Sequence, residues 1–351
     1  MSGGNEGADD LDLAALTAWM AAHVDGFEGP IDCRKFAGGQ SNPTYRLDAK
    51  SGAYVLRRKP FGDILPSAHA VEREYRVIAA LHPTGFPVAR PFGLCEDRDV
   101  IGAPFYIMEM VEGRTIWDGV MPDDSAESRR GHYEALVDTL AALHSVDYEA
   151  AGLGDYGKSG NYFERQVARW TKQYRLSQTD DIAEVERLIE FLPVSVPAQT
   201  RTSIVHGDYR IDNMIFADGA PRVKAVLDWE LSTLGDPLAD FAYLAMNWVT
   251  PPSEGRSGVM GRTGGDTGIP TLEEITQRYC AKTGREGVPD LNWYFSYNLF
   301  RLMAIVQGIK KRWIDGNASS ANAEAMAARV PELAQASWDF AVKAGAEGRK
   351  P

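Results

Sequence analysis

The sequence predicts an α+β fold of two lobes, a small β-rich lobe followed by a larger and mostly helical one. Residues 36–57 read as short strands around glycine-containing turns, whereas most segments after residue 131 show the apolar spacing of helices. A chain of 351 residues is also long enough to build a separate core in each lobe. We expect a disordered lead-in and first helix at 1–29, an N-terminal lobe at 30–110 and a helical C-terminal lobe at 111–351.

Composition and charge are those of a soluble globular protein, with 44% hydrophobic and 25% charged residues. The net charge of -12 argues against a nucleic-acid or anionic-membrane partner, because both would be repelled over most of the surface. No apolar stretch approaches the roughly 20 residues that span a bilayer. The three cysteines are far apart and fit no metal-binding spacing, which predicts reduced, structural thiols in the cytoplasm.

The N-terminus begins with an acidic, glycine-rich stretch. Residues 1–10 lack the basic and apolar regions of a signal peptide and predict a disordered lead-in. Leu16 and Met20 share the apolar face of the segment 11–23, which predicts a helix. We therefore expect a cytoplasmic protein whose folded part begins at this helix.

The N-terminal lobe is expected to contain a strand pair and a helix. The runs 44–47 and 54–57 flank a Ser-Gly turn and predict two strands. Residues 69–82 predict a helix whose apolar face also contains Glu74. A carboxylate on a buried face is unfavourable without a cationic partner, so Glu74 is expected to have one.

The rest of the chain predicts helices with a few short strands. A buried strand at 105–108 leads into 109–113, which suits a connection between lobes. Two further strands are expected at 214–216 and 223–227, and the stretch 250–270, with six glycines and three prolines, predicts a mobile loop. The expected helices are 131–147, 161–176, 181–191, 237–249, 272–283, 291–314 and 321–345.

The strongest functional signal is a set of oxygen-bearing side chains beside strand-like runs. Asp208 and Asn213 lie in the stretch IVHGDYRIDNMIF, and Asp228 follows the run VKAVL. Strands would hold these residues at one end of a small hairpin. Phosphoryl transfer needs these residue types, because a carboxylate must accept the hydroxyl proton and hard oxygen ligands must hold Mg²⁺. Asp208 is therefore the expected base, and Asn213 and Asp228 are the expected metal ligands.

Each of these residues has a structural alternative. Taken alone, Asp208 would be a turn residue, Asn213 a helix cap and Asp228 a strand-end carboxylate. Their combination at this spacing favours a phosphotransferase, and no hydrolase or dehydrogenase motif competes with it. His206 is expected to brace the loop through hydrogen bonds. Structural roles are likewise expected for Asp236 as a helix cap, Asp240 as a fold-stabilising carboxylate and His144 as an interior histidine.

The motif HGDYRIDN at 206–213, followed by DWE at 228–230, resembles the aminoglycoside phosphotransferase family, a branch of the protein-kinase-like fold that includes choline kinases. The stretches 54–60 and 65–77 are more specifically similar to the kinase-like domain associated with acyl-CoA dehydrogenases. The resemblance covers residues 30–310. It implies a bilobal, protein-kinase-like fold with ATP and Mg²⁺ bound between the lobes.

The resemblance also assigns residues of the N-terminal lobe to the nucleotide. Gly38, Gly39 and Ser41 would form the loop over the triphosphate. Arg57 stands where kinases place a strand lysine that binds the α- and β-phosphates. Glu74 is then the expected partner of Arg57, although arginine departs from the protein-kinase pattern.

The connection between the lobes resembles the kinase hinge. The backbone of Glu109 and Val111 would hold the adenine, with Met108 beside it as gatekeeper. The implied function is ATP- and Mg²⁺-dependent phosphorylation of a small-molecule hydroxyl. Residues 290–350 carry only scattered acids, which argues against an aminoglycoside, and the association with acyl-CoA dehydrogenases suggests a hydroxyacyl compound or its thioester. A nucleotide-binding pseudokinase that acts as an interaction module is the alternative from another class, and the sequence leaves the oligomeric state open.

Overall fold

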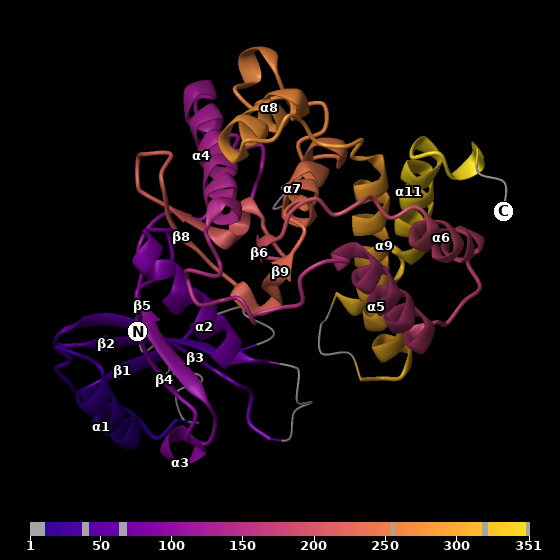
Figure 1. The fold of residues 1–351 in the computed structure, drawn as a ribbon. Coiled ribbons are helices and arrows are strands. Elements are labelled where there is room, and N and C mark those ends of the chain that lie inside the picture. Colours follow the sequence, from indigo (N-terminus) through magenta and orange to yellow (C-terminus); the bar gives the residue numbers. More distant parts are fainter. Residues whose placement is uncertain (1–10, 37–41, 63–68, 254–256, 318–321, 349–351) are drawn as a thin grey trace.

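The computed structural model describes residues 11–36, 42–62, 69–253, 257–317 and 322–348. Its two lobes lie side by side, with the sheet of the N-terminal lobe on one side and the helices of the C-terminal lobe on the other (Figure 1). The architecture is the predicted α+β fold of two lobes. The chain passes from one lobe to the other after strand β5.

The N-terminal lobe is built on one antiparallel sheet of five strands in the order β1-β2-β3-β5-β4. Side chains alternate between the two faces of a strand. On β5, Phe105 and Ile107 therefore pack with helix α1 (Leu13–His23), whereas Tyr106 packs with helix α2 (Val71–Leu81). The strands are β1 (Asp32–Lys35), β2 (Thr44–Ala49), β3 (Gly52–Arg58), β4 (Pro91–Cys95) and β5 (Phe105–Glu109), and the short helix α3 (Arg98–Ile101) follows β4.

The C-terminal lobe consists of helices around two short antiparallel strand pairs. Strand β6 (Ser203–Val205) pairs with β9 (Thr233–Gly235), and β7 (Met214–Phe216) pairs with β8 (Val223–Val226). The segments between these strands carry the predicted catalytic residues. The helices are α4 (Ala126–Ser145), α5 (Tyr162–Ser177), α6 (Ala183–Val194), α7 (Leu238–Ala245), α8 (Leu272–Thr283), α9 (Asn292–Ile314), α10 (Ala323–Ala327) and α11 (Val330–Lys343).

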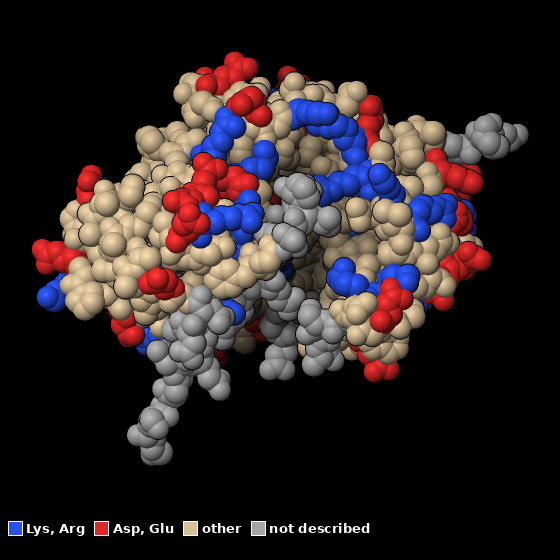
Figure 2. Space-filling model, turned by 90° about the horizontal axis from the view of Figure 1, so that it is seen from below, with Lys and Arg blue, Asp and Glu red and all other residues tan. Residues whose placement is uncertain are grey.

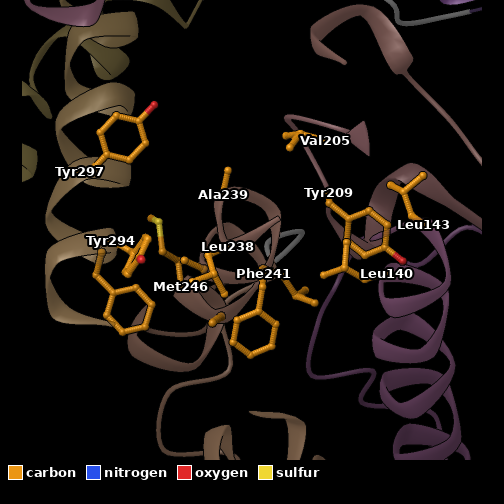
Figure 3. Close-up of a cluster of buried hydrophobic side chains, with 14 of the residues drawn as sticks. Leu140, Leu143, Val205, Tyr209, Leu238, Ala239, Phe241, Met246, Tyr294 and Tyr297 are labelled. Atoms are coloured by element: carbon orange, nitrogen blue, oxygen red, sulfur yellow. The ribbon is translucent and has the colours of Figure 1, made fainter. Parts of the chain in front are cut away.

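Helix α7 lies at the centre of the C-terminal core. In Figure 3, Leu238, Phe241 and Met246 lie between side chains of α4 and α9. The loop after β6 is anchored in the same core, because the hydroxyl of buried Tyr209 donates to the carbonyl of Leu136 at 2.8 Å. The apolar cluster continues into α2 of the N-terminal lobe, so continuous packing joins the two lobes.

The differences from the predicted elements have local causes. The helix expected at 321–345 is two helices, because Pro331 at the start of α11 has no N–H to bond to the preceding turn. Strands β1, β4 and β9 were not predicted. Strand β4 contains Pro91 and Gly93, which are poor strand formers, and β9 has only three residues. In the loop predicted to be mobile, Val259 and Ile269 are buried in the core.

The structure shows the state of the three cysteines and whether any described helix could cross a membrane. Cys33 and Cys95 lie in the core of the N-terminal lobe and Cys280 lies on α8, all three buried and free, as their spacing predicts. Among the described residues, no helix combines the length and the apolar character that crossing a bilayer requires.

Candidate active site

The loop that follows β6 is braced by His206. The imidazole Nε2–H donates to the carbonyl of Leu227 at 2.8 Å, and Nδ1 accepts the backbone N–H of Asp208 at 3.2 Å. A carbonyl can only accept and an N–H can only donate, so this pattern places the ring proton on Nε2 of a neutral imidazole. The ring is fully buried. His206 therefore has the bracing position predicted for it.

The carboxylate of Asp240 on α7 also holds this loop in place. Its carboxylate accepts the backbone N–H of His206 at 2.6 Å and that of Gly207 at 2.8 Å, and His144 Nε2 lies 3.3 Å away. Burial alone would raise the pKa of Asp240, but the hydrogen bond and charge of His144 hold it below its usual value. Gly207 has φ +87, and a Cβ there would lie 2.7 Å from the carbonyl of Leu231, so only glycine fits.

The three predicted reacting residues converge at one end of the β7–β8 hairpin. Asn213 Nδ2 donates to the backbone carbonyl of Asp208 at 2.9 Å and to its Oδ2 at 3.1 Å. The N–H of Leu227 donates to the carbonyl of Asn213 at 2.8 Å, which places Asp228 across the hairpin end. Asp228 itself has φ 64 and ψ 64, a left-handed conformation that is uncommon outside glycine and typical of functional sites.

Arg57 of β3 links this hairpin to the N-terminal lobe. Its Nε lies 2.7 Å from Oε2 of Glu74 on α2, and its Nη2 lies 2.9 Å from Oδ1 of Asp228. Glu230 is a further carboxylate at 3.7 Å. The predicted pairing of Arg57 with Glu74 is confirmed, and the additional bond to Asp228 makes Arg57 a bridge across the cleft.

Glu74 has the buried position that its place on the helix predicted. Its side chain is 1% exposed, and it accepts hydrogen bonds from Asn42 Nδ2 at 2.6 Å and from the hydroxyl of Tyr106 at 3.2 Å. Burial raises the pKa of Glu74 to about 7, although the charge of Arg57 opposes this shift. The carboxylate is thus held by three neighbours inside the wall of the cleft.

A cleft of about 580 Å³ opens between the lobes beside Arg57. Its walls include Met108, the connection 109–113 and, from the C-terminal lobe, Asn213 and Asp228. The predicted hinge residues Glu109 and Val111 are therefore on the wall of the cleft. The predicted phosphate loop with Gly38, Gly39 and Ser41 lies outside the described residues.

The donor set fits Mg²⁺ together with a nucleotide. Within the described residues there is no cluster of three or more His, Cys, Asp or Glu side chains that could hold a metal by themselves. Mg²⁺, however, is usually bound by one or two carboxylates together with substrate phosphates and water. Asp228, with 37% of its side chain exposed, and the amide oxygen of Asn213 could supply the protein share of such a shell.

A family model described as the APH phosphotransferase enzyme family matches residues 32–275. The chain belongs to this phosphotransferase family. Mouse acyl-CoA dehydrogenase family member 10 is a relative that is 45% identical over 318 residues, which are 90% of this chain but 30% of that protein. The phosphotransferase chain thus spans less than half the length of the first curated relatives that it matches.

Solved structures agree with this family. One from Ralstonia eutropha, whose assignment as an aminoglycoside phosphotransferase is provisional, has a TM-score of 0.87 and 47% identity, and the match covers 95% of this chain and 99% of that one. A ternary complex of aminoglycoside phosphotransferase APH(4)-Ia with AMP-PNP and hygromycin B has a TM-score of 0.59 and 16% identity, covering 90% of this chain and 96% of that one. The phosphotransferase therefore has the protein-kinase-like fold predicted for it.

Some polar residues of the site were missed by the sequence analysis. Arg210 Nε lies 3.2 Å from Oδ1 of Asp208, and its Nη1 lies 3.2 Å from Oδ2 of Asp212. Arg301 on α9 donates from Nη2 to the carbonyl of Gly207 at 2.8 Å. Arg210 could have been recognised from the sequence, because it is a cation only two residues after the expected base. Arg301 has none, since it is 94 residues away from its partner.

Proposed function

We propose that this phosphotransferase transfers the terminal phosphoryl group of Mg-ATP to a hydroxyl group of a small molecule. The observation that carries the proposal is the convergence of Asp208, Asn213 and Asp228 on one end of a hairpin beside an open cleft. Asp208 would orient the hydroxyl and receive its proton. Mg²⁺ on Asn213 and Asp228 would neutralise the phosphate charge.

The reaction balances without covalent participation of the protein. The hydroxyl oxygen forms a bond to the γ-phosphorus, the bond from that phosphorus to the β-phosphate oxygen breaks, and ADP leaves. The hydroxyl proton passes to Asp208. Arg57 and Arg210 lie where they could stabilise negative charge on the transferring group, so the catalysis rests on positioning and electrostatics.

Adenine would be held by the connection between the lobes. The backbone of Glu109 and Val111 lines the cleft, and backbone groups at this place could bond to the base without any special side chain. Gly38, Gly39 and Ser41 remain the proposed phosphate loop. The AMP-PNP complex of APH(4)-Ia, a protein of the same fold, supports nucleotide binding.

The Asp208→Asn variant tests the assignment of the base. Asparagine keeps the shape of the side chain but cannot accept the hydroxyl proton, so we expect turnover to fall by roughly 10²–10⁴-fold while ATP binding changes little. The measurement is transfer of labelled γ-phosphate to acceptors in a metabolite library, with mass spectrometry of the product. Wild-type turnover in this variant would exclude Asp208 as the base.

The acceptor is proposed to be a hydroxyacyl compound or its thioester. The names of the relatives support it, because the family members that match over 90% or more of this chain include acyl-CoA dehydrogenase family members 10 and 11. An aminoglycoside is the second candidate, supported by the names of the structural neighbours. Labelled transfer to each class separates the two.

A nucleotide-binding module without turnover is the candidate from another class. The observation that favours it is Arg57, which already neutralises Asp228 at the place proposed for the metal. Mg²⁺-dependent ATP binding without transfer to any acceptor would support this alternative. In either case we propose a cytoplasmic protein, which the three buried and unpaired cysteines support.

A further inference from the structure

Arg301 occupies an unusual electrostatic position next to the proposed base. It projects from α9 and donates from Nη2 to the carbonyl of Gly207, the residue before Asp208. The residue is only partly exposed. A guanidinium carries five N–H donors and a permanent charge, so one carbonyl satisfies only a small part of it.

In the described residues no carboxylate lies within ion-pair distance of Arg301, and the charge of Asp208 acts on it only from farther away. Arg57 and Arg210, the other arginines of the site, each pair with two or more carboxylates. Arg301 has no carboxylate within the 4.0 Å ion-pair distance in the part of the chain that the structure describes. Arg169 on α5 lacks such a partner as well, but it is exposed, so the argument from burial applies to Arg301 alone. A partly buried cation without a counter-ion is unfavourable unless an anion completes the site.

Aromatic rings contact both arginines, and Arg301 is the one that lies beside the loop of the proposed base. The guanidinium of Arg301 lies 5.7 Å from the ring centre of Trp170 and 5.3 Å from that of Tyr243, and the guanidinium of Arg169 lies 5.3 Å from the same ring of Trp170. Stacking on aromatic faces stabilises the cations without neutralising them. Burial, and then the negative charge of Asp208, raise the pKa of Tyr243, which indicates how close the base is.

One face of the molecule also gathers basic side chains around a hollow. Figure 2 shows a hollow near the centre of one face, with Lys and Arg side chains along its edges. The whole chain, in contrast, has a net charge of -12. A basic hollow on an acidic protein concentrates anions and repels cations.

We propose that Arg301, assisted by Arg169, binds an anionic group of the acceptor, so that the acceptor is a hydroxyl compound carrying a carboxylate or a phosphate. This inference rests on the proposed function, because it assigns the hydroxyl to Asp208. An anion bound by Arg301 supplies a close counter-charge, next to the loop that carries Asp208. A polycationic aminoglycoside meets like charge at the same place.

Binding of matched probes tests the proposal without any need for turnover. The full chain, with ADP and Mg²⁺ present, is titrated calorimetrically with 3-hydroxybutyrate and its amide, and with glycerol phosphate and glycerol. We expect one anionic probe to bind about tenfold or more tightly than its neutral counterpart, because a charged hydrogen bond contributes that much. The two pairs separate a carboxylate from a phosphate as the preferred anion.

Variants on α9 test whether Arg301 causes the preference for the anionic probe. Arg301→Met should abolish it and leave the affinity for the neutral probes unchanged, whereas Arg301→Lys should retain part of it. Arg312→Met, at an exposed position of the same helix, is the matched control and should behave as wild type.

Two results would overturn the inference. One is a wild-type protein that binds neither anionic probe more tightly than its neutral counterpart. The other is an Arg301→Met variant that weakens charged and neutral probes equally, which would make Arg301 a brace for the loop alone. Failure of the wild type to transfer phosphate would instead contradict the proposed function, since these titrations need no transfer.

Discussion

Arg57 lies close to three carboxylates of the site, and its removal should lower the free energy of unfolding. At pH 8, above the folded pKa of Glu74 of about 7, Arg57→Met leaves a buried carboxylate without its cation, and breaking a buried pair in this way costs about 3–5 kcal/mol of unfolding free energy. Glu74→Gln in the same chain should restore part of the loss. A double-mutant cycle by denaturant unfolding measures the coupling. Equal and additive losses would show that the two side chains do not depend on each other.

Glu74 should also make the stability depend on pH. Its folded pKa of about 7 lies above the ordinary value of 4.5, so between these pH values the folded state keeps a proton that the unfolded state releases. The resulting stabilisation is complete below the lower value and is lost as the pH rises to about 7. Glu74→Gln should remove this slope, a difference on the order of 1–3 kcal/mol measured by urea unfolding at pH 5 and pH 8. An unchanged slope would mean that Glu74 is ionised throughout.

At the scale of single residues, the sequence predicted contacts where a side chain broke a pattern. Glu74 interrupts an apolar stripe, and that anomaly alone implied a cationic partner, which is Arg57. The additional bond from Arg57 to Asp228 was not predictable, because it joins residues 171 positions apart across the cleft. Arg301 was missed for the same reason. Long-range contacts between two loops or helices leave no periodic signal.

Among the elements, α7 positions the loop that carries the proposed base. Asp240→Asn keeps one acceptor oxygen but turns an amide N–H₂ towards a backbone donor, which leaves a buried polar group unsatisfied. We expect a loss of about 1–3 kcal/mol in stability and a lower kcat with little change in the KM for ATP. Thermal unfolding and steady-state kinetics check this. A variant with normal kcat would show that the loop keeps its shape without the carboxylate.

Helices were predicted well where the apolar spacing repeats over several turns, whereas strands of only a few residues were missed. The helix α8 was predicted at its actual bounds, because a Thr271–Glu274 capping box and Gly284 mark its ends. Strand β9 is three residues long and gains its stability from pairing with β6. Such an element depends on tertiary context, which a local pattern does not contain.

For the whole molecule, the two lobes are joined in two ways. Apolar packing continues from α2 into the C-terminal core, and Arg57 bridges to Asp228. The N–H of Val226 next to the hairpin end also donates to the carbonyl of Pro87 at 2.9 Å. The continuous core fixes the position of the cleft walls, whereas the ion pair can be exchanged. A metal that binds Asp228 must compete with Arg57 for the same oxygen.

This competition predicts how ligands stabilise the phosphotransferase. Mg²⁺ alone should raise the melting temperature little, because Arg57 already neutralises Asp228, whereas Mg²⁺ with ATP provides phosphates that attract both cations. At a ligand concentration of 100 Kd the stabilisation is about 2.7 kcal/mol. Asp228→Ala should remove the advantage of Mg-ATP over ATP, and Asp218→Ala, in the exposed turn of the same hairpin, should keep it. If Mg²⁺ alone stabilises as much as Mg-ATP, the metal binds without the nucleotide, and the Arg57–Asp228 pair is not its competitor.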